Sequence, residues 1–168
     1  MSSPLPTAES GVVVMTCGLP GSGKSSYSQE LERRGYRRLS IDEVVWHRIG
    51  VDAATLPPAE YEELKADAER ELWNELVTLL EERRPVVLDY SFWSRATRKR
   101  YQALIESYGC RWELVHLKAD LETLRRRLAI RNARDGANSV TVSDELLQRY
   151  FASFEEPVGE GERVIPQV

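Results

Sequence analysis

Residues 18–25 read Gly18-Leu19-Pro20-Gly21-Ser22-Gly23-Lys24-Ser25 and fit the pattern G-x-x-x-x-G-K-[ST] at each fixed position. The apolar run before them, residues 12–17, is rich in β-branched side chains, which is typical of a buried parallel strand. Residues 26–34 after them favour a helix, and Gly35 suits its C-terminal end. A glycine loop between a strand and a helix turns its backbone N–H groups toward an anion, and the helix dipole favours the negative charge. The stretch therefore predicts a phosphate-binding P-loop.

The residue types in this loop indicate a nucleoside triphosphate with a magnesium ion. Lys24 would reach the β- and γ-phosphates, and the hydroxyl of Ser25 would be a Mg²⁺ ligand. A dinucleotide-binding fingerprint could also begin here, but Ser26 stands where its third glycine belongs and Lys24 has no role in it. The predicted nucleotide-binding residues are Gly18, Leu19, Pro20, Gly21, Ser22, Gly23, Lys24, Ser25 and Ser26.

Length and composition predict one domain with a single core. Of the 168 residues, 42% are hydrophobic and 30% are charged. We expect residues 1–10 to be a flexible N-terminal tail and residues 11–168 to form the domain. The net charge of −4 argues against broad binding of duplex nucleic acid. The sequence shows no transmembrane run, no signal pattern and no metal or redox motif at its two cysteines, so we expect a cytoplasmic protein that does not bind membranes.

Asp42 is the candidate general base. It follows the second predicted strand, residues 36–41, and begins another helix. Because ligands of open parallel sheets bind beyond the carboxyl ends of the strands, Asp42 would lie beside the phosphates and accept the proton of a substrate hydroxyl. The alternative role is a helix N-cap, which aspartate commonly provides. Glu43 is the fallback base.

Asp89 is the candidate metal ligand of the third predicted strand. Residues 85–89 form an apolar run that ends in this aspartate. This is the Walker B arrangement, in which an acidic residue at a strand end holds Mg²⁺ directly or through water. Together with Ser25, Asp89 makes up the predicted metal site.

Aromatic and basic residues near the same edge of the sheet are candidates for contact with the phosphoryl acceptor. The aromatic residues either line an acceptor pocket or pack against the following helix, residues 95–108. Arginines at the start of that helix oppose its dipole and therefore suggest an anionic ligand. The candidates are Trp46, Phe92, Trp93, Arg95 and Arg98.

A basic helix after the fourth predicted strand suggests a lid. Asp120 would cap this helix, and Arg127 and Arg131 share one of its faces because they are four residues apart. Arginines neutralise the charge that spreads over a transferred phosphoryl group, and we expect an arginine-bearing lid at about residues 125–142. The alternative is a solvated basic face with salt bridges to Glu122.

The remaining pattern is that of an α/β domain. A long amphipathic helix is predicted at residues 59–84, and further strands are predicted at residues 111–117 and 163–166. Strands thus alternate with helices along most of the chain, which indicates a parallel sheet with helices on both faces. The sequence contains no internal repeat and no second domain.

With these motifs in place, residues 11–165 resemble the small P-loop kinases of the AAA-type ATP-binding family. This group lies near polynucleotide kinase, chloramphenicol phosphotransferase and the zeta toxins. The most specific stretches are Gly18–Ser25, Leu39–Asp42, Val87–Trp93, residues 124–132 and Phe154–Pro157. The resemblance implies the P-loop NTPase fold of nucleoside and adenylate kinases, with five parallel strands in the order 2-3-1-4-5. It also implies that Asp42 is the base on the acceptor hydroxyl and that Arg127 and Arg131 are lid arginines.

One position departs from the polynucleotide kinases. Those enzymes carry an arginine three residues after the base, where it holds a substrate phosphate, and this chain has Val45 there. The departure favours an ATP- and Mg²⁺-dependent kinase that phosphorylates a hydroxyl of a small molecule, such as a metabolite or an antibiotic. A polynucleotide 5′-hydroxyl kinase is the first alternative. The second alternative is an ATP-dependent switch without a small-molecule acceptor.

Overall fold

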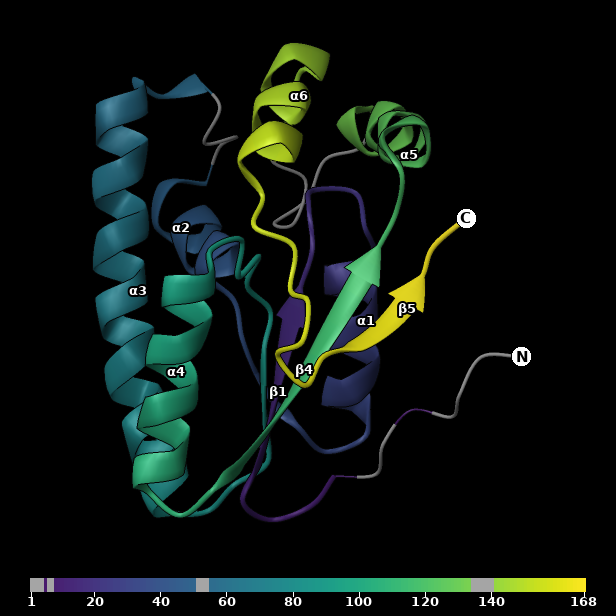
Figure 1. Ribbon diagram of the computed structural model, residues 1–168. Helices are drawn as coiled ribbons and strands as arrows, with labels where there is room; N and C mark the ends of the chain where they lie inside the picture. The colour runs from purple at the N-terminus through teal and green to yellow at the C-terminus, as the bar shows by residue number, and fades with distance from the viewer. Residues whose placement is uncertain (1–4, 6–7, 51–54, 134–140) are drawn as a thin grey trace.

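The computed structural model describes residue 5 and residues 8–50, 55–133 and 141–168. Much of the predicted tail and the centre of the predicted lid lie outside the described residues. In chain order (Figure 1) the elements are β1 (Val12–Cys17), α1 (Lys24–Arg33), β2 (Arg37–Leu39), α2 (Ile41–Ile49), α3 (Pro58–Glu81), β3 (Val86–Leu88), α4 (Arg95–Ser107), β4 (Arg111–Lys118), α5 (Leu121–Asn132), α6 (Asp144–Ser153) and β5 (Arg163–Pro166). None of the helices in these ranges combines the length and apolar character needed to cross a membrane.

The five strands form one parallel sheet in the order β2-β3-β1-β4-β5, which confirms the predicted α/β fold and strand order. β1 lies at the centre, with Val13 in register with Val86 of β3 on one side and with Trp112 of β4 on the other. All six residues of β1 are buried, as expected for a parallel strand that is covered on both faces. Because the strands are parallel, their carboxyl ends meet at one edge of the sheet, where the P-loop follows β1.

Two layers of helices bury the two faces of the sheet. Met15 of β1 belongs to a core cluster with Leu76 of α3 and Ile105 of α4. Val14, which points to the opposite face, packs in a cluster with Leu31 of α1. Figure 1 shows α3 and α4 together on one side of the sheet and α1 on the other. This arrangement fixes both ends of the P-loop, since β1 and α1 are each held in a core.

The boundary between β2 and α2 differs from the prediction. β2 ends at Leu39, and α2 begins at Ile41, so Asp42 lies in the first turn of a helix. The cause is Ser40, which has extended backbone angles and whose hydroxyl accepts a hydrogen bond from the backbone N–H of Glu43 at 3.3 Å. Ser40 is therefore the N-cap, and the alternative role considered for Asp42 is wrong.

Arg98 was expected to contact an acceptor, and the structure places it in the core instead. Its side chain is about 1% exposed. Its Nε and Nη2 donate to the two carboxylate oxygens of Glu160, each at 2.9 Å, and its Nη1 donates to the carbonyl of Phe92 at 2.7 Å. The arginine at the start of α4 is thus explained by a buried ion pair that joins α4 to the segment before β5.

We predict that Arg98→Met lowers the free energy of unfolding by about 3–5 kcal/mol, because it leaves the carboxylate of Glu160 buried without its partner. Urea denaturation would measure the loss. Arg33→Met is the matched control, since it removes an exposed arginine that pairs with Glu30 at 2.6 Å, and little change is expected. Equal stability of the two variants would contradict a structural role for the buried pair.

The same pair predicts a pH dependence of stability. Hydrogen bonds from Arg98 hold the pKa of Glu160 below its usual value of 4.5 in the folded protein. The contribution of Glu160 is therefore complete above pH 4.5 and is lost as the pH falls through the folded-state pKa. We expect the stability difference between wild type and Glu160→Gln to shrink over this acidic range in parallel denaturation curves. A difference that is independent of pH would contradict the linkage.

Candidate active site

The P-loop is shaped so that a phosphate can approach its backbone. Gly23 has φ 97°, the left-handed region that glycine adopts without strain, and it is the N-cap of α1. No side chain caps this helix end, so the first N–H groups of α1 remain directed toward the loop. A Cβ at Gly18 would lie 2.6 Å from the Oγ of Ser22, so the close approach of Ser22 to the start of the loop also requires glycine. Both glycines serve a loop that presents backbone donors to an anion.

Lys24 lies across this loop and beside two carboxylates. Its Nζ donates to the carbonyl of Leu19 at 3.0 Å. Burial lowers the pKa of Lys24, and the negative charges of Asp89 and Asp42 oppose that shift. The structure therefore brings together the predicted phosphate ligand, the predicted metal ligand and the predicted base.

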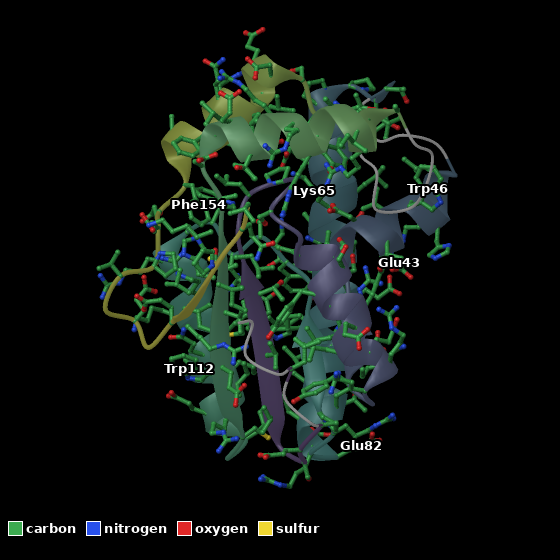
Figure 2. All side chains as sticks on the ribbon, turned by 90° about the vertical axis from the view of Figure 1, so that its right-hand side faces the viewer. Glu43, Trp46, Lys65, Glu82, Trp112 and Phe154 are labelled. Atoms are coloured by element: carbon green, nitrogen blue, oxygen red, sulfur yellow. The ribbon has the colours of Figure 1, made fainter. Side chains whose placement is uncertain are left out.

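The side chain of Asp42 has surface that is accessible to solvent, although many protein atoms lie around its carboxyl group. Burial by surrounding protein atoms raises the pKa of its carboxyl above the usual value, and the charges of Lys24, Lys65 and Arg131 oppose the rise. A carboxylate with solvent access and nearby cations has the chemistry of a general base for a hydroxyl. Figure 2 shows Lys65 and Glu43 in the same upper half of the molecule, whereas Glu82 lies at the opposite end.

Two residues of this region were missed by the sequence analysis. Lys65, on α3, has its Nζ 4.6 Å from the ring centroid of Tyr61, and its charge reaches Asp42. Arg38, in β2, donates to the Oδ2 of Asp89 from Nε at 3.1 Å and from Nη2 at 2.8 Å. The only signal for Arg38 was a charged residue in a predicted strand just before the candidate base, and no local pattern marked Lys65.

The residues present fit a magnesium ion that arrives with the nucleotide. Ser25 directly follows Lys24 in α1, and Asp89 directly follows β3, so both oxygen ligands belong to the segments that meet at the P-loop. Within the described ranges, no group of three or more His, Cys, Asp or Glu side chains forms a dedicated metal site. Mg²⁺ in nucleotide enzymes commonly binds one or two protein ligands together with the phosphates, which matches this donor set.

The two candidate lid arginines have different surroundings. Arg127 donates from Nη1 to the carbonyl of Ser22 at 3.3 Å and to the side-chain oxygen of Gln167 at 3.2 Å. Arg131 instead contributes its charge at both Lys24 and Asp42. Arg127 thus connects α5 to the backbone of the P-loop. Arg131 is the arginine whose positive charge acts on Lys24 and Asp42.

The described ends of the predicted lid are tied to each other. The side chain of Asn132 bonds to the backbone of Val142 in both directions, at 2.9 and 3.2 Å. Arg125 donates to Asp144 at 2.5 Å, so this arginine of the basic helix pairs with α6. Residues 134–140 of the predicted lid lie outside the described residues.

The aromatic candidates for the acceptor pocket separate into two kinds. Phe92 is 2% exposed and packs against Tyr90 and Tyr101 at ring distances of 5.4 and 5.2 Å, so it belongs to the core. Trp93 is 53% exposed directly beside it. Trp46 is partly buried on α2 and lies in the same half of the molecule as Glu43 (Figure 2). Trp93 and Trp46 remain candidates for acceptor contact, and Arg95 remains one as an exposed residue at the start of α4.

The sheet order, the glycine loop after its central strand and the aspartates beyond β2 and β3 define a P-loop nucleotide-binding domain of the kinase type. A family model described as an AAA domain matches residues 13–157, and the chain belongs to this AAA-domain family. The comparison with curated proteins gave no match.

Three solved structures illustrate the fold. A gluconokinase from Sinorhizobium meliloti is 21% identical with a TM-score of 0.64, and the alignment covers 93% of this chain and 82% of that one. Kti12 from Chaetomium thermophilum, in complex with ADP-AlF3, is 17% identical with a TM-score of 0.64, covering 92% and 88%. A chain of the Pnkp1/Rnl/Hen1 RNA repair complex is 19% identical with a TM-score of 0.70, covering 90% and 46%.

The contrast between the lid arginines gives a prediction about nucleotide discrimination. Arg131→Gln should reduce the preference for ATP over ADP by about 10- to 100-fold, the value of a lost hydrogen bond to a charged group. Isothermal titration with each nucleotide would measure the two affinities. Arg127→Gln is the matched variant, and it should weaken both nucleotides alike because Arg127 contacts the P-loop backbone. If Arg127→Gln lowered the preference for ATP and Arg131→Gln weakened both nucleotides alike, the roles assigned to the two arginines would be wrong.

Proposed function

We propose that this protein is an ATP- and Mg²⁺-dependent kinase that transfers the γ-phosphoryl group to a hydroxyl of a small molecule. The observation that carries the proposal is the electrostatic cluster of Lys24, Asp89 and Asp42 at the carboxyl edge of the sheet. Membership of the AAA-domain family and the fold shared with a gluconokinase support it. A nucleotide switch would need the P-loop and Asp89 but has no use for a base such as Asp42.

The proposed reaction uses each residue for one task. Asp42 accepts the proton of the acceptor hydroxyl as its oxygen attacks the γ-phosphorus, and the bond to the ADP oxygen breaks in line. Lys24 and Arg131 neutralise the charge that develops on the transferred group. Ser25 and Asp89 would hold Mg²⁺, which supplies further charge neutralisation on the phosphates. The products are ADP and the phosphorylated acceptor.

A small acceptor is favoured over a polynucleotide by the basic residues at α4. A 5′-hydroxyl kinase would use arginines 95, 98 and 100 to follow the phosphates of the strand. Arg98 is buried against Glu160, and Arg100 pairs with Glu69 at 2.7 Å, which leaves Arg95 for this task. The fold shared with a chain of an RNA repair complex keeps the polynucleotide kinase as the second candidate.

The acceptor class can be assigned by ADP release with ATP and Mg²⁺ in the presence of a 5′-hydroxyl oligonucleotide or a library of hydroxylated small molecules. Stimulation by one small-molecule class supports the proposal and identifies the substrate. Stimulation by the oligonucleotide alone assigns the second candidate. ATP binding without any stimulation would favour the switch.

We predict that Asp42→Asn lowers phosphoryl transfer by about 10²- to 10⁴-fold, the usual contribution of a general base, while ATP still binds. The measurement is the rate of acceptor-dependent ADP release together with the ATP dissociation constant. Glu43→Gln is the neighbouring variant, and it should retain a faster rate than Asp42→Asn. A near-normal rate in Asp42→Asn would remove this residue from the mechanism.

A further inference from the structure

Arg38 is a buried cation that joins two parts of the candidate site. It is the middle residue of β2, and its side chain is 5% exposed. Nε and Nη2 donate to the Oδ2 of Asp89 at 3.1 and 2.8 Å, and Nη1 donates to the Oε2 of Glu43. One guanidinium group thus connects the end of β3 with the first turn of α2.

The sheet register brings these groups together. Arg38 is in register with Val87 of β3, and the backbone N–H of Asp89 donates to the carbonyl of Leu39 at 2.8 Å. Asp89 stands two positions after Val87, so its side chain points to the same face of the sheet as that of Arg38. The long arginine side chain can therefore reach the carboxylate from the neighbouring strand.

Glu43 is fixed at two points. Its carboxylate accepts from Arg38, and its backbone N–H donates to the hydroxyl of Ser40 at 3.3 Å. Asp42, the candidate base, precedes it in the same helical turn. A group that holds Glu43 consequently holds the turn that carries Asp42.

We propose that Arg38 is a positioning residue of the magnesium–nucleotide site, which fixes the carboxylate of Asp89 and, through Glu43, the helical turn of Asp42. The inference rests on the proposed function, because it concerns the same site. Arginine suits both partners better than lysine, since three nitrogens of its planar fork donate in two fixed directions whereas lysine offers a single charged nitrogen.

Arg37, the preceding residue of β2, provides a matched control. It donates to Glu75 of α3 from Nε at 3.1 Å and from Nη2 at 2.6 Å, so it has the same chemistry as Arg38. Its side chain is 48% exposed, and its partner is neither the metal candidate nor a residue of α2. A change at Arg37 tests the effect of removing a strand arginine without touching the site.

The experiment measures the affinity for ATP by isothermal titration, once in EDTA and once with saturating Mg²⁺. The ratio of the two dissociation constants is the magnesium gain. Arg38→Gln should keep the affinity in EDTA and lower the magnesium gain by about 10- to 100-fold, as is typical when a residue that orients a metal ligand is lost. Arg38→Lys should lose part of the gain, and Arg37→Gln should match wild type. An unchanged gain in Arg38→Gln, or an equal loss with and without Mg²⁺, would overturn the inference.

A second variant covers the case in which Arg38→Gln fails to fold because Asp89 is left buried without its cation. The double variant Arg38→Gln/Asp89→Asn removes both charges, and its magnesium gain should equal that of Asp89→Asn alone, because residues that act through one contact are not additive. A further fall in the double variant would overturn the proposed route through Asp89. Absence of ATP binding by the wild type would instead overturn the proposed function, so the two failures are distinguishable.

Discussion

The site depends on the complete enclosure of β1. β3 and β4 flank this strand, helices cover both of its faces, and all six of its residues are buried. Its one hydroxyl, on Thr16, is used internally and donates to the carbonyls of Leu88 and Tyr90 at 2.9 and 3.1 Å. The central strand can therefore offer polar groups to a ligand only where it ends, and there the backbone of the glycine loop provides them. Most side chains of the site come from the helices and from the segments that follow β2 and β3.

Among the described residues, two ion pairs are buried on both sides, and they join different elements. Arg98 and Glu160 join α4 to the segment before β5. Arg38 and Asp89 lie at the carboxyl edge beside Lys24. Burying a carboxylate such as that of Asp89 requires a compensating cation, because an unpaired buried charge is strongly unfavourable. A strand arginine meets this requirement while it leaves the P-loop lysine available for phosphate.

The sequence predicted the parts of the structure that depend on local or periodic patterns. The P-loop and the proximity of Asp42 and Asp89 follow from motif spacing and from the rule that parallel strands end at one edge, whereas the strand order came from the resemblance to small P-loop kinases. The roles of the arginines did not follow in the same way. Arg38 and Arg98 have the same chemistry, yet their buried partners, Asp89 and Glu160, lie 51 and 62 residues away along the chain, and no local pattern encodes such a pairing. The N-cap was missed because Ser40 and Asp42 are both good capping residues, and only the backbone angles distinguish them.

The nucleotide half and the acceptor half of the site are built by different means. Backbone groups of a contiguous loop form the first, so its specificity for phosphate is inseparable from the fold itself. In the proposed function, side chains from α2, α3 and the segment after β3 form the second, and three of them, Trp46, Lys65 and Trp93, retain access to solvent. Exposed side chains contribute little to the core, so they can change without loss of the sheet or of the P-loop. The same sheet and P-loop can therefore carry kinases for unrelated hydroxyl compounds, and the proposed function assigns the choice of acceptor to these three side chains.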